Sequence, residues 1–306
     1  MIPQAGTGTL TGIIPVLEVP FHDDGRIDLK GFHAVVGNVR AAGVPAVMFP
    51  GFASEFHKLD SSERDMLGAA LAEHDVPAIV SIPDHATYHA VRNAAAAVER
   101  GAAAVNVLPP HQLGPSRDAV LDHLREVLWA VAPIPVVVQY APAQTGTALD
   151  AATLRTLAAE HANLAMVKVE SVPPGRLIAA LADPAGPGRP LAAMVGYAGL
   201  QMIDALRRGA SGVQPGCSFP EPYLEIWRRW AHGDQTGAEA LHTRMLPYLS
   251  YWMQGVELIV AVEKEISRRR GWFASAHCRA PAHRLDHEEL AMIDRFCAEF
   301  LPEAAR

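Results

Sequence analysis

The sequence predicts a (β/α)8 TIM barrel followed by a C-terminal three-helix extension. Short apolar runs alternate eight times with longer segments in which apolar residues recur every three or four positions. The short runs are continuous in apolarity, as in parallel strands buried on both faces. The length of 306 residues accommodates a barrel of about 250 residues with an appendix.

Each predicted strand is followed by a predicted helix. The strands are expected at residues 13–19, 46–49, 78–82, 104–108, 135–140, 164–169, 191–195 and 212–214. The helices are expected at residues 29–42, 62–72, 86–100, 117–131, 151–160, 175–182, 201–208 and 221–231. Five residues are predicted as helix N-caps: Asp28, Ser61, Asp84, Ser116 and Asp150. A doubly wound open sheet is the alternative fold, but no Gly-x-Gly-x-x-Gly follows the first strand.

The pattern changes after about residue 233, where strand-like runs end. Three helices are predicted at residues 236–246, 249–270 and 286–301, and Pro247 is expected to separate the first two. We therefore predict a catalytic barrel over residues 1–232 and a helical extension packed on it over residues 233–306.

Composition excludes several classes of protein. The formal net charge is −7 and no basic run occurs, which argues against a nucleic-acid partner. No apolar run approaches the ~18 residues of a membrane-spanning helix, and the start of the chain lacks the basic segment of a signal peptide. Three cysteines without paired spacing are typical of a reduced, cytoplasmic protein.

Lysine is rare in this chain, with four lysines against 22 arginines. Lys30, Lys58 and Lys264 lie in polar or amphipathic stretches, and no special role is predicted for them. Lys168 instead ends an apolar run, at the end of a barrel strand where functional groups gather. Burial there is expected to lower its pKa, and a neutral amine can form a Schiff base with a ketone.

Two structural alternatives stay open for these residues. The Lys168 ammonium could instead reach solvent or pair with Glu170. Tyr140 ends the neighbouring strand, where its phenol could shuttle a proton at the imine or simply cap the core with its hydroxyl in water.

Four segments resemble the pyruvate-dependent class I aldolases typified by dihydrodipicolinate synthase and N-acetylneuraminate lyase. These segments are TGIIPVLEVPFHDDGRID, GVPAVMFPGFASEFHKLDSSER, VVVQYAPAQTG and MVKVES. The resemblance implies that Lys168 forms the imine and that Tyr140 relays the proton. It also implies that no metal or organic cofactor is needed, because the lysine serves as the electron sink.

The loop at residues 51–55 departs from the family pattern. It contains Gly-Phe-Ala-Ser-Glu where the family has Gly-Thr-Thr-Gly-Glu. The family's threonines bind the substrate carboxylate. Here the backbone N–H groups of Ala53 and Ser54, with the Ser54 hydroxyl, are expected to do so.

Three further positions are candidates for substrate binding by resemblance. His111 lies in LPPHQLG, where the synthase places tyrosines. Gln144 replaces the arginine with which the synthase binds a second carboxylate, which argues for a divergent member rather than the lysine-biosynthetic synthase. Gly196 is expected to contact the substrate through its backbone.

The predicted function is a Schiff-base-forming class I lyase acting on pyruvate or a related 2-oxo acid with an aldehyde partner. Aldol cleavage, aldol condensation and dehydration of a 2-keto-3-deoxy acid are all consistent with this chemistry. The alternatives are a non-catalytic 2-oxo-acid-binding barrel and a true 4-hydroxy-tetrahydrodipicolinate synthase. A metal-dependent enzyme is not predicted, since the strand ends lack a set of carboxylates and histidines. The family usually forms a homotetramer, a dimer of dimers, and we expect the same here.

Overall fold

The strands and helices lie where the apolar pattern predicts them. The computed structural model describes residues 10–146 and 148–301, which divide into two compact units. One unit holds residues 10–11 and 77–214, and the other holds residues 12–76 and 215–301. The boundary predicted at residue 233 falls inside the second unit and stays a prediction.

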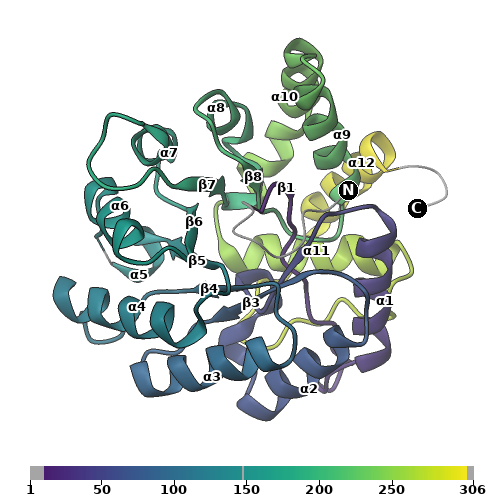
Figure 1. The fold of residues 1–306 in the computed structure, drawn as a ribbon. Coiled ribbons are helices and arrows are strands. Elements are labelled where there is room, and N and C mark those ends of the chain that lie inside the picture. Colours follow the sequence, from purple (N-terminus) through teal and green to yellow (C-terminus); the bar gives the residue numbers. More distant parts are fainter. Residues whose placement is uncertain (1–9, 147, 302–306) are drawn as a thin grey trace. The chain divides into compact units, whose positions relative to one another are not determined.

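The first unit contains six parallel strands that pair in chain order. They are β3 (Ala78–Ile82), β4 (Ala104–Val107), β5 (Val136–Tyr140), β6 (Leu164–Val169), β7 (Ala192–Val195) and β8 (Gly212–Val213). The helices that connect them are α3 (Thr87–Glu99), α4 (Arg117–Val131), α5 (Pro142–Thr145), α6 (Ala151–Glu160), α7 (Gly175–Ala182) and α8 (Met202–Arg207). Figure 1 shows these helices along the outside of the curved sheet that the six strands form.

The second unit contains the first two strand–helix repeats and the C-terminal helices. Its elements are β1 (Gly12–Ile13), α1 (Leu29–Ala41), β2 (Val47–Phe49), α2 (Ser61–Ala72), α9 (Pro220–Ala231), α10 (Gln235–Trp252), α11 (Val256–Arg269) and α12 (His287–Phe300). Val16 continues β1 by parallel bridges to Met48 and Gly216. All eight predicted strands are confirmed, and their order with the helices is that of a (β/α)8 barrel with C-terminal helices.

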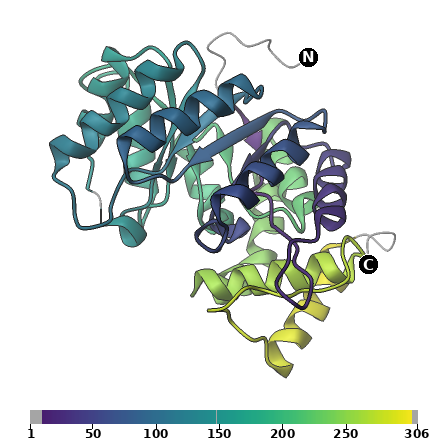
Figure 2. The ribbon, with the colours of Figure 1, turned by 90° about the horizontal axis from the view of Figure 1, so that it is seen from below.

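The predicted helix break at Pro247 is wrong, because α10 runs through this proline and ends at Trp252. A proline inside a helix costs about 3 kcal/mol. Burial on both sides of it offsets this cost: Trp252 is fully buried and its ring centroid lies 5.0 Å from that of Phe296 on α12. Figure 2 shows the C-terminal helices in yellow-green and yellow.

Three of the five predicted caps are confirmed by a side chain that accepts a backbone N–H, namely Asp28, Ser116 and Asp150. The predictions for Ser61 and Asp84 are wrong. Asp60 caps α2, because its carboxylate accepts from the Glu63 N–H in a reciprocal capping box. Asp84 instead accepts from the side chain of Asn93.

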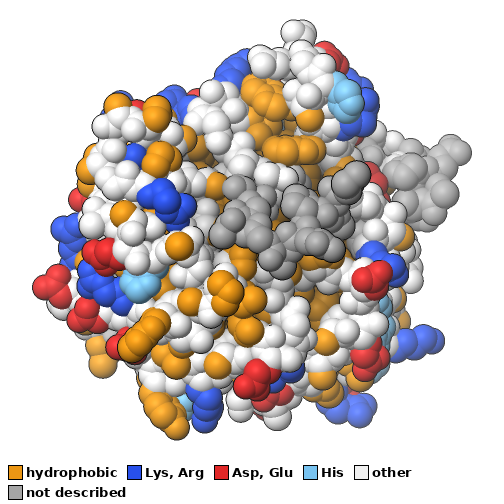
Figure 3. Space-filling view, in the orientation of Figure 1, with side chains coloured by type: hydrophobic (Ala, Val, Ile, Leu, Met, Phe, Trp, Pro, Cys, Tyr) orange, Lys and Arg blue, Asp and Glu red, His pale blue; other side chains and the backbone are white. Residues whose placement is uncertain are grey.

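Lys and Arg side chains and Asp and Glu side chains are both visible around the rim of the face drawn in Figure 3. Among residues 10–146 and 148–301, no helix has both the length and the apolarity needed to cross a membrane.

Two of the buried glutamates in the second unit, Glu18 and Glu263, have strongly raised pKa values. Burial raises the pKa of Glu18 to about 8. A hydrogen bond from the Ser267 hydroxyl lowers this pKa, and the neighbouring Glu263 carboxylate raises it. Burial likewise raises the pKa of Glu263 to about 7, although the Ser218 N–H and hydroxyl donate to it. Lys264 and the Cys217 thiol also face Glu18, and both lower its pKa.

Because the pKa values of these two carboxyls are raised, we expect the free energy of unfolding to fall as pH rises. Both bind protons more tightly in the folded protein than in the unfolded chain, where the ordinary value is 4.5. Their stabilisation is complete below pH 4.5 and is lost as pH rises toward 8, at about 1 kcal/mol per pH unit for each group. Thermal unfolding at pH 5, 6.5 and 8 measures this slope. The Glu18→Gln/Glu263→Gln variant should flatten it, whereas exchange of the exposed Glu73 for glutamine should not.

Candidate active site

Strand β6 carries Lys168 on the inner face of the first unit. Lys168 pairs with Gln139 on β5 and with Met194 on β7. Paired residues of a parallel sheet share a face, and residues two apart on one strand share it as well. Lys168, Gln139 and Glu170 therefore point the same way, and the lysine side chain is 3% exposed.

The carboxylate of Glu170 contacts both Lys168 and Gln139. Nζ of Lys168 lies 3.3 Å from Oε1 of Glu170, and Nε2 of Gln139 donates to the other oxygen at 2.7 Å. Gly196 lies beneath this carboxylate, where an added Cβ would come within 2.5 Å of Oε1 of Glu170. Glycine is therefore required at position 196 for Glu170 to occupy this place.

The polar contacts continue across two more strands. Nδ2 of Asn106 on β4 donates to Oε1 of Gln139 at 3.0 Å and to Oγ of Ser81 on β3 at 2.8 Å. All three side chains are buried, and Oδ1 of Asn106 has no hydrogen-bond partner among the described atoms. Buried polar groups are costly unless they are bonded. These hydrogen bonds fix the orientation of the Gln139 amide. The amide in turn determines which oxygen of Glu170 faces Lys168.

The sequence analysis missed Gln139, Asn106 and Ser81. The signal available in the sequence was that each of these polar residues interrupts an apolar run. Glu170 follows Lys168 by two positions, which places both side chains on the same face.

Tyr140 is the last residue of strand β5 and is half-buried. It pairs with Val169, one position further along than the pair of Gln139 with Lys168. Gln139 therefore occupies the position that faces Lys168, and the role of Tyr140 as proton relay stays a prediction.

The predicted role of Tyr140 has a direct test. The Tyr140→Phe variant removes only the phenol hydroxyl, and loss of a proton relay is expected to lower kcat by about 10²-fold. Steady-state turnover within about threefold of the wild type would contradict this role.

The substrate candidate Gln144 forms hydrogen bonds with Tyr197. Nε2 of Gln144 donates to the Tyr197 hydroxyl at 2.8 Å, and that hydroxyl lies 3.2 Å from Oε1 of Gln144. Tyr197 follows Gly196 in a left-handed backbone conformation with φ 50°. The pair offers hydrogen bonds but no fixed positive charge at the position where the synthase has its arginine. Tyr197 was not predicted from the sequence.

His111 lies against a second histidine beyond β4. Its ring centroid is 4.4 Å from that of His85, and its Nδ1 lies 3.2 Å from the Pro109 carbonyl oxygen. Nδ1 of His85 accepts the backbone N–H groups of His111 and Gln112, both at 3.3 Å. Burial, with the neighbouring His111, lowers the pKa of His85.

Ser54 belongs to the second unit, where its polar groups are engaged. Its N–H donates to the Gly51 carbonyl at 2.9 Å, and its hydroxyl accepts from the Gly51 N–H at 2.9 Å and donates to the Leu17 carbonyl at 2.5 Å. Of the donors predicted for a substrate carboxylate, the Ala53 N–H is therefore the better candidate.

The C-terminal histidines do not form a ligand set. His283 pairs with Glu289 at 2.9 Å, and the exposed His287 lies beside Glu288. Within residues 10–146 and 148–301, no three side chains of the His, Cys, Asp or Glu type are placed to hold a metal ion.

The sequence profile of the Dihydrodipicolinate synthetase family matches residues 9–298. The chain belongs to this family. It is 30% identical to L-2-keto-3-deoxyarabonate dehydratase of Azospirillum brasilense over 92% of each chain. It is 27% identical to 4-hydroxy-tetrahydrodipicolinate synthase of Haloarcula marismortui, over 91% of this chain and 90% of the relative.

Solved structures of the dihydrodipicolinate synthetase family share the fold. A synthase from Rhodopseudomonas palustris superposes with a TM-score of 0.85 at 24% identity, over 94% of this chain and 97% of that chain. YagE of Escherichia coli K12, solved in complex with pyruvate, gives 0.84 at 25% identity, over 96% and 99%. These similarities confirm the predicted barrel and the prediction that the protein is an enzyme, a lyase of this family.

Proposed function

We propose that the protein dehydrates a 2-keto-3-deoxy sugar acid through a Schiff base on Lys168. The observation that carries this proposal is the buried Lys168 with Glu170 at 3.3 Å and Gln139 bonded to the same carboxylate. The name of the Azospirillum relative, a 2-keto-3-deoxyarabonate dehydratase, supports the substrate class. The pyruvate bound to YagE supports a 2-oxo acid at the lysine.

The chemistry follows from these side chains. The amine of Lys168 attacks the C2 ketone, and water leaves as the imine forms. The protonated imine withdraws electrons from C3, and the Glu170 carboxylate accepts the proton released there. The resulting enamine expels the C4 hydroxyl, which takes that proton and leaves as water. In a five-carbon substrate the C3=C4 product then tautomerises, as one hydrogen from C5 and one from its hydroxyl move to C3 and C4 and leave an aldehyde at C5. Hydrolysis of the imine consumes the water released at the first step, so that one water is lost overall.

Gln139 acts as a positioning residue in this scheme. Its amide donates to the Glu170 oxygen that does not face Lys168 and is itself oriented by Asn106. A fixed base in the correct place is worth more than a mobile one, because no reorganisation is needed in the transition state.

Aldol cleavage is the second candidate, because the same imine and carboxylate would serve it. Glu170 would then take the proton of the C4 hydroxyl while the C3–C4 bond breaks. A non-catalytic binding barrel is disfavoured, since binding alone does not require a buried lysine on a carboxylate. The lysine-biosynthetic synthase is disfavoured because Gln144 and Tyr197 supply no cation for a second carboxylate.

Two measurements test the proposal together. Borohydride reduction with pyruvate, read by peptide mass spectrometry, should label the peptide that contains Lys168. Incubation with a five-carbon 2-keto-3-deoxy acid should then yield a dehydrated semialdehyde, whereas aldol cleavage would yield pyruvate, which lactate dehydrogenase detects. Absence of any adduct across a panel of 2-oxo acids would favour the binding barrel.

We also infer a cytoplasmic homotetramer from the family resemblance. Light scattering of the purified protein tests the assembly state.

A further inference from the structure

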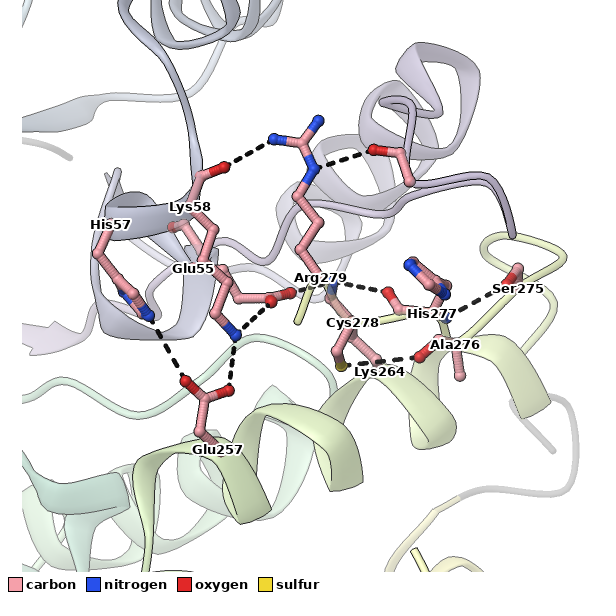
Figure 4. A network of polar contacts seen from close by, with 12 residues as sticks. Glu55, His57, Lys58, Glu257, Lys264, Ser275, Ala276, His277, Cys278 and Arg279 are labelled. Carbon is pink, nitrogen blue, oxygen red and sulfur yellow. Dashed lines mark hydrogen bonds and ion pairs between the residues drawn. The ribbon is translucent and has the colours of Figure 1, made fainter. Parts of the chain in front are cut away.

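Two of the four lysines converge on one buried carboxylate in the second unit. Nζ of Lys264 on α11 bonds to Oε1 of Glu55, and Nζ of Lys58 bonds to Oε2 at 3.0 Å. Glu55 and Lys264 are fully buried, and the Lys58 side chain is 5% exposed. Figure 4 shows the three side chains pointing toward one another between the loop and α11.

The three N–H donors of each ammonium group are engaged: Lys58 meets three acceptors, and Lys264 meets two acceptors and the face of an aromatic ring. Lys58 donates to Glu55, to Glu257 at 2.7 Å and to the Pro281 carbonyl at 2.6 Å. Lys264 donates to Glu55 and to the His277 carbonyl at 3.0 Å, and its Nζ lies 4.1 Å from the ring centroid of Phe21. The network is therefore saturated and leaves no donor for a ligand.

This saturation explains why lysine persists in an arginine-rich chain. An ammonium directs three donors in three directions, whereas a guanidinium presents a flat fork and needs more room. The contacts around Lys58 and Lys264 come from several directions and therefore match an ammonium group rather than a guanidinium.

The carboxylate is attached to a strained point of the backbone. Glu55 has φ 53°, in the left-handed region that residues other than glycine seldom adopt. It separates the two single-turn helices at Phe52–Ser54 and Phe56–Lys58. Such a conformation persists only when its surroundings hold it, and the two lysines supply that restraint.

A third cation secures the far end of the same loop. Nη1 of Arg279 donates to the Lys58 carbonyl at 2.7 Å and to Glu63 at 2.7 Å. The guanidinium carbon of Arg279 lies 4.5 Å from the ring centroid of Phe21, on whose ring Lys264 also rests.

We propose that Lys264 and Lys58 are positioning residues that hold residues 51–58 in this conformation, and that the loop so held binds the carboxylate of a 2-oxo acid through the Ala53 N–H. The C-terminal helix α11 thereby takes part in substrate binding without touching the substrate. This inference rests on the proposed function, because it assumes that the loop binds a 2-oxo acid.

The test compares Lys264→Met, Glu55→Gln and the double variant with the exposed Lys30→Met as control. Hydrogen exchange of the peptide over residues 51–58 should be faster in both single variants than in the wild type or the control. KM for the keto acid should rise about tenfold while kcat stays within about threefold, because the loop binds carboxylate and performs no chemistry.

The double variant separates positioning from stability. It leaves no unpaired charge on this pair, so its melting temperature should exceed that of Lys264→Met, while its KM stays raised. KM should also rise in Lys264→Arg, because the guanidinium fork does not match the arrangement of two acceptors and one ring around Lys264. If Lys264→Met fails to fold, Lys58→Met at the edge of the network replaces it.

Unchanged loop exchange and unchanged KM in Lys264→Met would overturn the inference. A fall in kcat with KM unchanged would also overturn it, since that result indicates a role in the chemical step. If the wild type itself forms no imine with any 2-oxo acid, the proposed function fails and the substrate role of the network fails with it. Loop exchange would then still decide whether the lysines hold the backbone.

Discussion

Replacing Lys168 by methionine is expected to lower kcat by about 10⁴-fold or more and to abolish the borohydride adduct. Methionine has similar length and is tolerated in apolar cores, so the barrel should keep its shape. The amine is lost, and with it the electron sink that stabilises the carbanion at C3. Steady-state turnover and intact-protein mass spectrometry measure the two effects.

The matched control for Lys168 is Lys30→Met, which changes an exposed lysine at the start of α1. This variant should retain full turnover and the adduct. Turnover by Lys168→Met above about one part in a hundred of the wild type would contradict the Schiff-base mechanism. An adduct that persists on another peptide would contradict the assignment of the lysine.

The Glu170→Gln variant is expected to separate imine formation from the later proton transfers. The amide has the same shape, so Gly196 still leaves room for it, but it cannot accept the C3 proton at neutral pH. We expect kcat to fall by about 10²- to 10³-fold while the borohydride adduct on Lys168 still forms. Exchange of the C3 hydrogens of pyruvate for deuterium, followed by NMR, should slow to a similar extent.

Exchange of the exposed Glu126 on α4 for glutamine serves as the control and should change neither rate. Wild-type rates of C3 exchange in Glu170→Gln would exclude this carboxylate as the base. Loss of the adduct together with turnover would instead give Glu170 a role in imine formation.

Local sequence determined the elements and pointed to Lys168 as the lysine of the proposed mechanism. Continuous apolar runs predicted all eight strands, because buried parallel strands must be apolar on both faces. Lys168 could be identified because a charged side chain at the end of such a run is costly and needs a reason. The segments that resemble the family lie within the matched residues 9–298.

Register and packing were decided by the tertiary structure. Tyr140 and Gln139 are adjacent in sequence, and only the pairing of β5 with β6 decides that Gln139 faces Lys168. A shift of one residue exchanges the faces, and the run VVVQY is apolar on both faces before it reaches this pair. The helix through Pro247 depends in the same way on the distant Phe296, whose packing compensates for the lost hydrogen bond.

The lysines show the same division. Their rarity is plain from composition, and a single helix pattern explained Lys264 as one polar residue of an amphipathic segment. Its contact with Glu55 joins residues 209 positions apart, so no local pattern could predict it.

The sequence determined which residues carry charge, and the folded chain decided which charges meet. The reason is that the energy of an ion pair depends on a distance that is set only when remote segments pack together.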